Sequence, residues 1–258
     1  MFGFAKPQPL LQDEQTQWMF DVFSWCLQNF NADFFHQHSV LVLPSNRFFP
    51  GRADSAQDMA QLIFNNVKRY AGIVHWPTQV VDHNTCSITT NPQITINGPL
   101  RISASDSDQY SITTEHPLTI PYNPQQISNP EGLIASFAHI TAHHMGQMAQ
   151  QPPPGGAELW PHTTEMLAIF LGFGLMFANS AYTFRGGCGS CYNASANRDA
   201  FLTEQQSVYG LALFAVLKGL PNSEVVPNMK KHLRSFYKKA VKDIQHHSRE
   251  LDQLSATA

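Results

Sequence analysis

Charged side chains are scarce in this chain of 258 residues. They make up 14% of it, against roughly 25% in an average soluble domain. Phenylalanine (18 residues) and histidine (12 residues) are prominent instead. We therefore expect a core rich in aromatic rings and a surface that is more polar than ionic. The net charge of −3 argues against general electrostatic attraction to nucleic acid, so no nucleic-acid partner is expected.

The sequence also lacks several signatures that identify common enzyme classes. It contains no glycine-rich phosphate loop, no GxSxG nucleophile turn and no dinucleotide-binding fingerprint. Each of these motifs carries a physical mechanism, such as backbone amides that hold a phosphate or a strained turn that exposes a serine. Their absence turns attention away from nucleotide-dependent enzymes and serine hydrolases.

Cysteine is too rare for a disulfide scaffold, because the chain holds only Cys26, Cys86, Cys188 and Cys191. Residues 1–15 lack the cationic start and apolar run of a secretory signal. We therefore expect a cytoplasmic protein with reduced thiols. The Cys188–Cys191 spacing is that of a CxxC pair. A loop without cysteine chemistry is favoured there, and a redox pair and a metal site remain as alternatives.

Long hydrophobic runs are also rare. Residues 166–184 form a run of 19 positions without a charged side chain, which is close to the roughly 20 residues that span a bilayer. Asn179, Ser180 and Thr183 interrupt it, and no second such run accompanies it. A helix that is apolar all round also suits the centre of a globular domain. We expect a buried helix and no membrane span.

The hydrophobic patterns predict an α+β fold. Short β-rich runs fall between residues 79 and 120, and helical periodicity dominates after residue 130. We expect a small mixed or antiparallel sheet, with residues 1–125 and 126–258 as two parts of one compact domain. The predicted helices are 13–30, 55–70, 131–149, 162–182, 203–218 and 224–248, and the predicted strands are 40–43, 87–90, 93–96, 100–103 and 110–114. Asp13, Ser55 and Thr203 are the predicted N-caps.

Positive charge is concentrated near the C-terminal end. Residues 230–242 carry six of the 16 Lys and Arg residues and no acid, so the rest of the chain holds 10 bases against 19 acids, a balance of −9. Lys230, Arg234, Lys238 and Lys242 repeat every four residues, and apolar side chains occupy the other face. We call these four residues the basic stripe. They predict an amphipathic helix packed on the core, and contact with an anionic ligand is the alternative.

The most informative motif is a pair of histidines, His139 and His143, with the spacing of the HExxH motif of zinc proteases. Residues four apart lie on one helical face, so both imidazoles can reach one zinc ion while the Glu activates the bound water. Here Ile140 replaces that Glu. His144 lies one turn from Ile140 and is the candidate substitute for orienting or deprotonating the water. A second-shell or surface position for His144 is the alternative.

Two residues are candidates for the third zinc ligand. His162 and Glu165 lie three apart on the next predicted helix, so they share a face. They follow His143 by 162 − 143 = 19 and 165 − 143 = 22 residues, and a ligand about twenty residues beyond the second His is the gluzincin arrangement. Glu158 is less well placed. The alternative is a polar cluster without metal, because histidine pairs four apart arise readily in a His-rich chain.

The sequence resembles a group of uncharacterised bacterial proteins with a zincin-like metallopeptidase core. The likeness lies in LIASFAHITAH (residues 133–143), where an apolar run leads into the motif, and in TEMLAIFLGFG (residues 164–174), where an acidic residue opens a hydrophobic helix. The resemblance implies a zincin-like fold with metal ligands at His139, His143 and Glu165. It places the general base of the family at Ile140, which puts peptidase activity in doubt.

Three functions follow as expectations. The first is a diverged zincin-like protein without ordinary peptidase activity that binds a peptide or protein partner, with or without zinc at His139 and His143. The second is an active metal-dependent hydrolase in which His144, Glu165 or Glu158 replaces the missing base. Loss of a general base typically costs about 10²- to 10⁴-fold in rate. The third is an anionic-ligand binder that uses the basic stripe.

Overall fold

The computed structural model describes residues 9–85, 96, 98–110, 117–181 and 200–257. The fold is α+β and mostly helical, with one small sheet among the described residues. The helices are α1 (Asp13–Asn29), α2 (Ala32–His38), α3 (Ala56–Ala71), α4 (Pro130–Gly146), α5 (Trp160–Ala168), α6 (Gly174–Ser180), α7 (Glu204–Leu217), α8 (Asn222–Val225), α9 (Arg234–His246) and α10 (Ser248–Ala256). The strands are β1 (Thr78–Asp82) and β2 (Leu118–Tyr122). Short 3-10 turns include Ala104–Gln109, Pro124–Ser128 and Gly156–Leu159.

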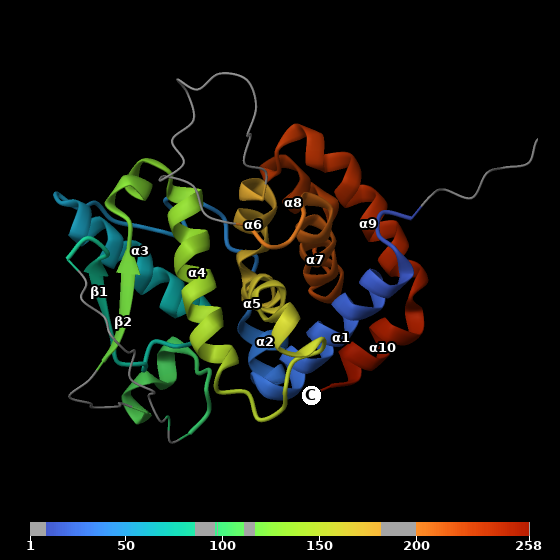
Figure 1. The fold of residues 1–258 in the computed structure, drawn as a ribbon, viewed down its shortest axis with the longest axis horizontal. Helices are drawn as coiled ribbons and strands as arrows, with labels where there is room; N and C mark the ends of the chain where they lie inside the picture. Colours follow the sequence, from blue (N-terminus) through green and yellow to red (C-terminus); the bar gives the residue numbers. More distant parts are fainter. Residues whose placement is uncertain (1–8, 86–95, 97, 111–116, 182–199, 258) are drawn as a thin grey trace, which may run out of the picture.

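The helices pack side by side in an order that differs from their order in the chain (Figure 1). The sheet and α3 lie on one side of α4, and α5 and α6 lie on its other side. Beyond them α7 packs against α6 and α9, while α1 contacts α5 and α10. The buried apolar side chains form one core that extends from Leu10 to Leu254. Aromatic pairs lie within it, such as Phe35 stacked on Phe170 with ring centroids 4.5 Å apart.

The sheet differs from the sequence-based expectation. β1 and β2 pair in parallel, with Val80 opposite Ile120, and neither strand was predicted as a separate run. The predicted strands at residues 40–43 and 100–103 are wrong, because both segments are irregular. The predicted strands at residues 87–90, 93–96 and 110–114 lie wholly or largely outside the described residues. The short parallel pair buries alternate side chains of β2 against the helices.

Most of the predicted helices are confirmed, together with two of the three predicted caps. The Ser55 side chain accepts a hydrogen bond from the Asp58 amide at the start of α3. Thr203 and Gln206 form a capping box at the start of α7. The prediction of Asp13 as an N-cap is wrong, because Gln12 occupies that position and pairs with Gln15. Asp13 instead lies in the first turn, where a carboxylate complements the helix dipole.

The long apolar helix is buried and broken. The helical stretch from Gly156 to Ser180 is long and apolar enough to cross a membrane, but 94% of its apolar window is buried inside the fold. A π-helical turn over Ile169–Phe173 separates α5 from α6. Gly172 there has a φ of 106°, and a Cβ atom would meet the Val40 carbonyl oxygen. The Gly172 carbonyl accepts a hydrogen bond from the Val42 amide at 3.0 Å, so the break holds residues 40–42 against the helix.

The C-terminal segment forms the predicted amphipathic helix, but with interruptions. Residues 224–248 divide among α8, two 3-10 turns and α9, because Pro227 and the turn at Lys231–Leu233 break the helical pattern. Tyr237, Ala240 and Ile244 of α9 are buried against the core. Lys230, Lys238 and Lys242 of the basic stripe are exposed. The division of charge and hydrophobicity between two faces is therefore confirmed.

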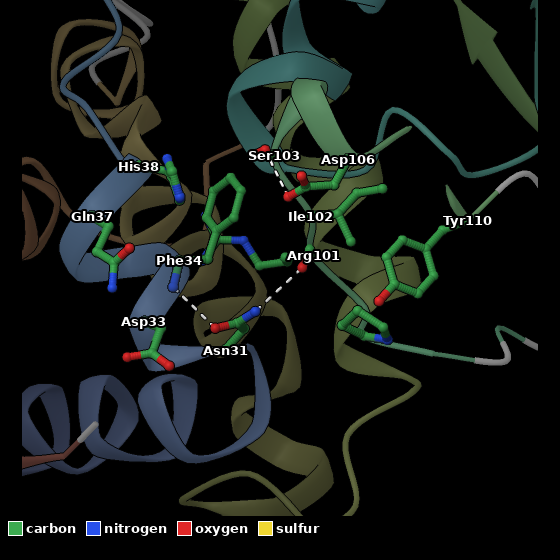
Figure 2. A pocket seen from close by; sticks show the side chains of 11 residues that line it. Asn31, Asp33, Phe34, Gln37, His38, Arg101, Ile102, Ser103, Asp106 and Tyr110 are labelled. Carbon is green, nitrogen blue, oxygen red and sulfur yellow. Dashed lines mark hydrogen bonds between the residues drawn. The ribbon is translucent and has the colours of Figure 1, made fainter. Parts of the chain in front are cut away.

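A fully buried arginine, Arg101, connects three distant segments near α2. Its side chain donates hydrogen bonds to the Ala71 and Phe30 carbonyls and to the Ser39 hydroxyl, and it lies 4.2 Å from the centre of the Phe34 ring. Burial lowers the pKa of Arg101 to about 9. Arg101 lies beside a cavity of about 200 Å³ at this junction. Figure 2 shows the side chains that line it.

Candidate functional site

The two motif histidines lie on α4, whose start is specified locally. The Asn129 side chain accepts a hydrogen bond from the Gly132 amide, and Pro130 occupies the first turn, where its missing N–H costs nothing. α4 packs directly against α5, which carries the two candidate third ligands. The structure therefore confirms the predicted pair of neighbouring helices. We call His139, His143, His144 and His162, together with Glu165, the histidine face.

His143 has a polar neighbour at each ring nitrogen. The Trp160 indole donates to His143 Nδ1 at 3.3 Å, and the Gln147 side-chain nitrogen lies 3.1 Å from His143 Nε2. Burial lowers the pKa of His143 below its ordinary value of 6.5. The imidazole is therefore neutral at pH 7. A metal ion at Nδ1 would have to replace the hydrogen bond from Trp160.

His144 is buried next to His143, with the two ring centroids 5.6 Å apart. Its pKa is lowered by burial and, to a smaller extent, by His143, while a hydrogen bond to the Gln147 side chain acts in the opposite direction. Ile140, at the position of the missing Glu, is half-buried and packs against the core. An aliphatic side chain there can neither accept nor donate a proton.

His139 and His162 both contact the ring of Phe201. The His139 and Phe201 rings are stacked, with centroids 6.0 Å apart and planes 19° apart. The His162 ring meets Phe201 edge-on at 6.2 Å. Phe201 is nevertheless 43% exposed, and is one of two large hydrophobic residues described as exposed. An aromatic side chain from the start of the α7 segment therefore lies across the two imidazoles.

Glu165 is completely buried, and both of its carboxylate oxygens accept backbone hydrogen bonds. The Phe201 amide donates to Oε1 at 3.2 Å, and the Leu202 amide donates to Oε2 at 2.9 Å. Such charge-assisted bonds are stronger than neutral ones. Glu165 therefore anchors the segment that places Phe201 on the histidines. Glu158, the other acidic candidate, is exposed in the turn before α5.

These residues do not form a metal centre as they are arranged. Among the residues that the structure describes, no group of three or more His, Cys, Asp or Glu side chains is placed to hold a metal ion. His143 Nδ1 and the oxygens of Glu165 already have protein partners. A tetrahedral zinc site needs three converging protein ligands, so this arrangement does not fit one. Zinc binding at His139 and His143 stays a prediction.

A cavity of about 270 Å³ lies beside His162. Its lining is largely apolar and includes Trp18 of α1 and Leu159. The carboxylate-bearing side chain of Glu14 and the amides of Gln15 and Gln206 also line it. His162 Nδ1 is buried and has no hydrogen-bond partner, although buried polar atoms are normally satisfied.

Sequence reasoning missed the aromatic residues that complete this region. The donor to His143 is Trp160, and its closeness to the motif follows from the packing of α4 on α5, which spacing alone does not give. Phe201 comes from beyond residues 182–199, so no local pattern links it to His139. Cys26 is a buried free thiol, and the Cys86 thiol and the CxxC pair of Cys188 and Cys191 lie outside the described residues.

Comparison with known proteins identifies no relative. No family model matches the chain, no curated protein matches it, and no solved structure matches its fold. The functional argument therefore depends on the geometry of the site itself.

Proposed function

We propose that this chain is a diverged zincin-like protein without ordinary peptidase activity, and that Phe201 and the cavity beside His162 bind a peptide or protein partner. The use of Glu165 carries this proposal. A metallopeptidase needs such a carboxylate free to reach an ion, and here it accepts the Phe201 and Leu202 amides. Glu165, the candidate third zinc ligand, therefore holds in place the segment that carries Phe201.

The chemistry of the surface fits a peptide side chain better than an ion. The exposed Phe201 ring lies between two imidazoles, and aromatic residues are frequent anchors of protein interfaces. The adjacent cavity offers Trp18 and Leu159 as apolar walls, and the side chains of Glu14, Gln15 and Gln206 as polar groups. Pockets of this kind, mostly apolar with a few polar groups, bind ligands in many proteins.

Peptide display on immobilised full-length protein in the presence of a chelator tests the binding function. We expect peptides with apolar or aromatic side chains to be selected, and Phe201→Ser to weaken them about 30-fold, as for an interface anchor worth about 2 kcal/mol. Val40→Ser is the matched control, because Val40 has nearly the same exposure, 45% against 43%. The proposal fails if no peptide is selected, or if both variants bind like the wild type.

Restoring the missing Glu tests the absence of peptidase activity. Ile140→Glu should hydrolyse no peptide in the presence of zinc, because Glu165 is engaged by the Phe201 and Leu202 amides. Casein and a quenched fluorescent peptide mixture serve as substrates. A metal-dependent hydrolysis that His139→Ala abolishes would refute the proposal.

A metal-dependent hydrolase is the second candidate, and His144 is the observation in its favour. Burial lowers the pKa of His144, so the imidazole is neutral at pH 7 and suited to accept a proton. It lies beside His143, one of the two predicted ligands. This function requires bound metal, so a content below a tenth of an equivalent of any transition metal in protein purified without chelator would remove its foundation.

The basic stripe supports a third and weaker proposal, contact with an anionic ligand. Lys230, Lys238 and Lys242 are exposed, and Arg234 donates to the Met229 and Pro227 carbonyls. Such binding would weaken strongly with salt. Heparin retention that is lost at moderate salt, and reduced in Lys238→Ala, would support it.

A further inference from the structure

A cavity of about 670 Å³ lies on a part of the molecule that the histidine face does not use. One wall is the irregular segment that follows α2, and the opposite wall is the end of α7 with the start of α8. The segment is positioned by the break at Gly172, where the Val42 amide donates to the Gly172 carbonyl. The cavity is in the size range of ligand pockets.

The lining of this cavity is mainly apolar. The hydrophobic side chains around it are Val40, Leu41, Leu43, Phe48 and Leu220. Val40 is 45% exposed, although an aliphatic side chain gains free energy when it is covered. A ligand with an apolar body would remove this surface from water.

Two cations at the same cavity have no carboxylate partner among the residues that the structure describes. Arg47 lines it, with its guanidinium 5.9 Å from the centre of the Phe48 ring, and forms no ion pair among the described residues. Lys218 donates to the Phe35 and His36 carbonyls at 2.7 and 2.6 Å, which occupies two of its three N–H groups. Burial, followed by the charge of Arg101, lowers the pKa of Lys218. A nearby anion would stabilise its charged form.

Glu224 is the one acidic side chain in the lining, so the cations exceed the acids by one. The combination of an apolar lining and an excess of positive charge selects for a molecule with an apolar chain and an anionic head. We propose that this cavity binds a long-chain carboxylate, with its chain against Val40 and Leu220 and its head group near Arg47 and Lys218. This site is independent of the proposed peptide-binding surface.

Calorimetric titration of the full chain with dodecanoate, below its micellar concentration, tests the proposal. We expect saturable binding of one molecule per chain. Decanoate should bind up to about 15-fold more weakly, because each buried methylene contributes about 0.8 kcal/mol. Dodecyltrimethylammonium has the same chain with the opposite charge and should show no saturable binding. Equal binding of the two dodecyl probes, or no saturable binding of dodecanoate, would overturn the proposal.

Substitutions in the lining locate the site. Arg47→Gln should weaken dodecanoate about tenfold, as expected for the loss of a hydrogen bond to a charged group. Arg52→Gln is the matched control, because Arg52 is exposed and does not line the cavity. Val40→Asp, which places a negative charge on the apolar wall, should also weaken dodecanoate. Thermal unfolding of each variant establishes that it is folded.

The outcomes separate this site from the peptide-binding surface. Phe201→Ser should leave dodecanoate affinity unchanged, whatever its effect on peptides. Binding that is equal in wild type, Arg47→Gln and Val40→Asp would refute the proposed location. Selected peptides that lose binding in Val40→Ser, while dodecanoate fails to bind, would show a peptide site here and would also overturn the proposal.

Discussion

Two histidines of the histidine face, His139 and His143, have the same four-residue spacing as the basic stripe, but the two groups differ in their surroundings. Glu165 is completely buried and His143 is half-buried, and each accepts hydrogen bonds from protein groups. Lys238 and Lys242 are exposed on α9. The same spacing therefore predicts a shared helical face in both cases. Burial decides whether the polar groups on that face organise their neighbours or remain available to solvent.

If buried polar groups organise their neighbours, the largest loss of stability should come from a substitution at Glu165. Glu165→Ala removes the acceptor of two amides, one of which belongs to the buried Leu202. We expect the free energy of unfolding to fall by about 3 kcal/mol, because hydrogen bonds to charged groups contribute about 1.5–3 kcal/mol each. Urea unfolding measures this, and Glu165→Gln should lose less because it keeps one acceptor oxygen. A loss below about 1 kcal/mol in Glu165→Ala would contradict an anchoring role.

Gly172 tests the break that joins the buried helix to residues 40–42. Gly172→Ala introduces a Cβ against the Val40 carbonyl at a φ of 106°, where side chains are strained. We expect destabilisation of about 2 kcal/mol, seen as a lower thermal midpoint. Gly156→Ala is the control, because it also has a positive φ, 63°, but has no neighbouring atom within 4 Å of the added Cβ. Equal losses in the two variants would mean that the contact with Val40 contributes nothing.

The enclosed histidines also predict how stability depends on pH. Burial lowers the pKa values of His143 and His144 below their ordinary value of 6.5. The unfolded chain therefore takes up protons at a higher pH than the folded chain does. The free energy of unfolding should fall as the pH drops below about 6.5, towards the lower pKa values of the folded state.

Urea unfolding at pH 7.5 and pH 5.5 checks this sign. The difference between the two pH values should shrink in a His143→Gln, His144→Gln double variant, because its side chains do not titrate. An unchanged difference would show that other groups cause the dependence.

The smallest effect is expected on the basic stripe. Lys238→Ala should change the free energy of unfolding by no more than about 0.5 kcal/mol. At low salt the variant should be slightly more stable than the wild type. Lys238 lies four residues from both Arg234 and Lys242, and like charges at this spacing repel. Urea unfolding at low and high salt measures the effect. A loss above about 1 kcal/mol would mean that the stripe is not simply a solvated face.

The helices could be predicted from sequence because their signals are local. The Ser55 cap and the Thr203 capping box mark helix starts, and the apolar periodicity of α9 marks its buried face. The parallel pairing of β1 with β2 was missed because the partners lie about forty residues apart, as in Val80 and Ile120. Neither strand forms a long β-branched run.

The candidate site could be predicted only in outline. The i, i+4 relation placed His139 and His143 on one helix, and α5 does pack against it. The partners of each side chain depend on tertiary packing. The Trp160 indole reaches His143, and Glu165 binds amides of a segment 36 and 37 residues further along the chain. Spacing indicates which residues share a helical face, but it does not predict which groups form hydrogen bonds with their side chains.

A crystal structure of protein purified without chelator and crystallised with zinc tests the central claim most directly. The account predicts that Glu165 keeps its bonds to the Phe201 and Leu202 amides, and that the Phe201 ring stays on His139 and His162 with no ion between the helices. A zinc ion bound to His139, His143 and either Glu165 or His162, with Phe201 displaced, would contradict it.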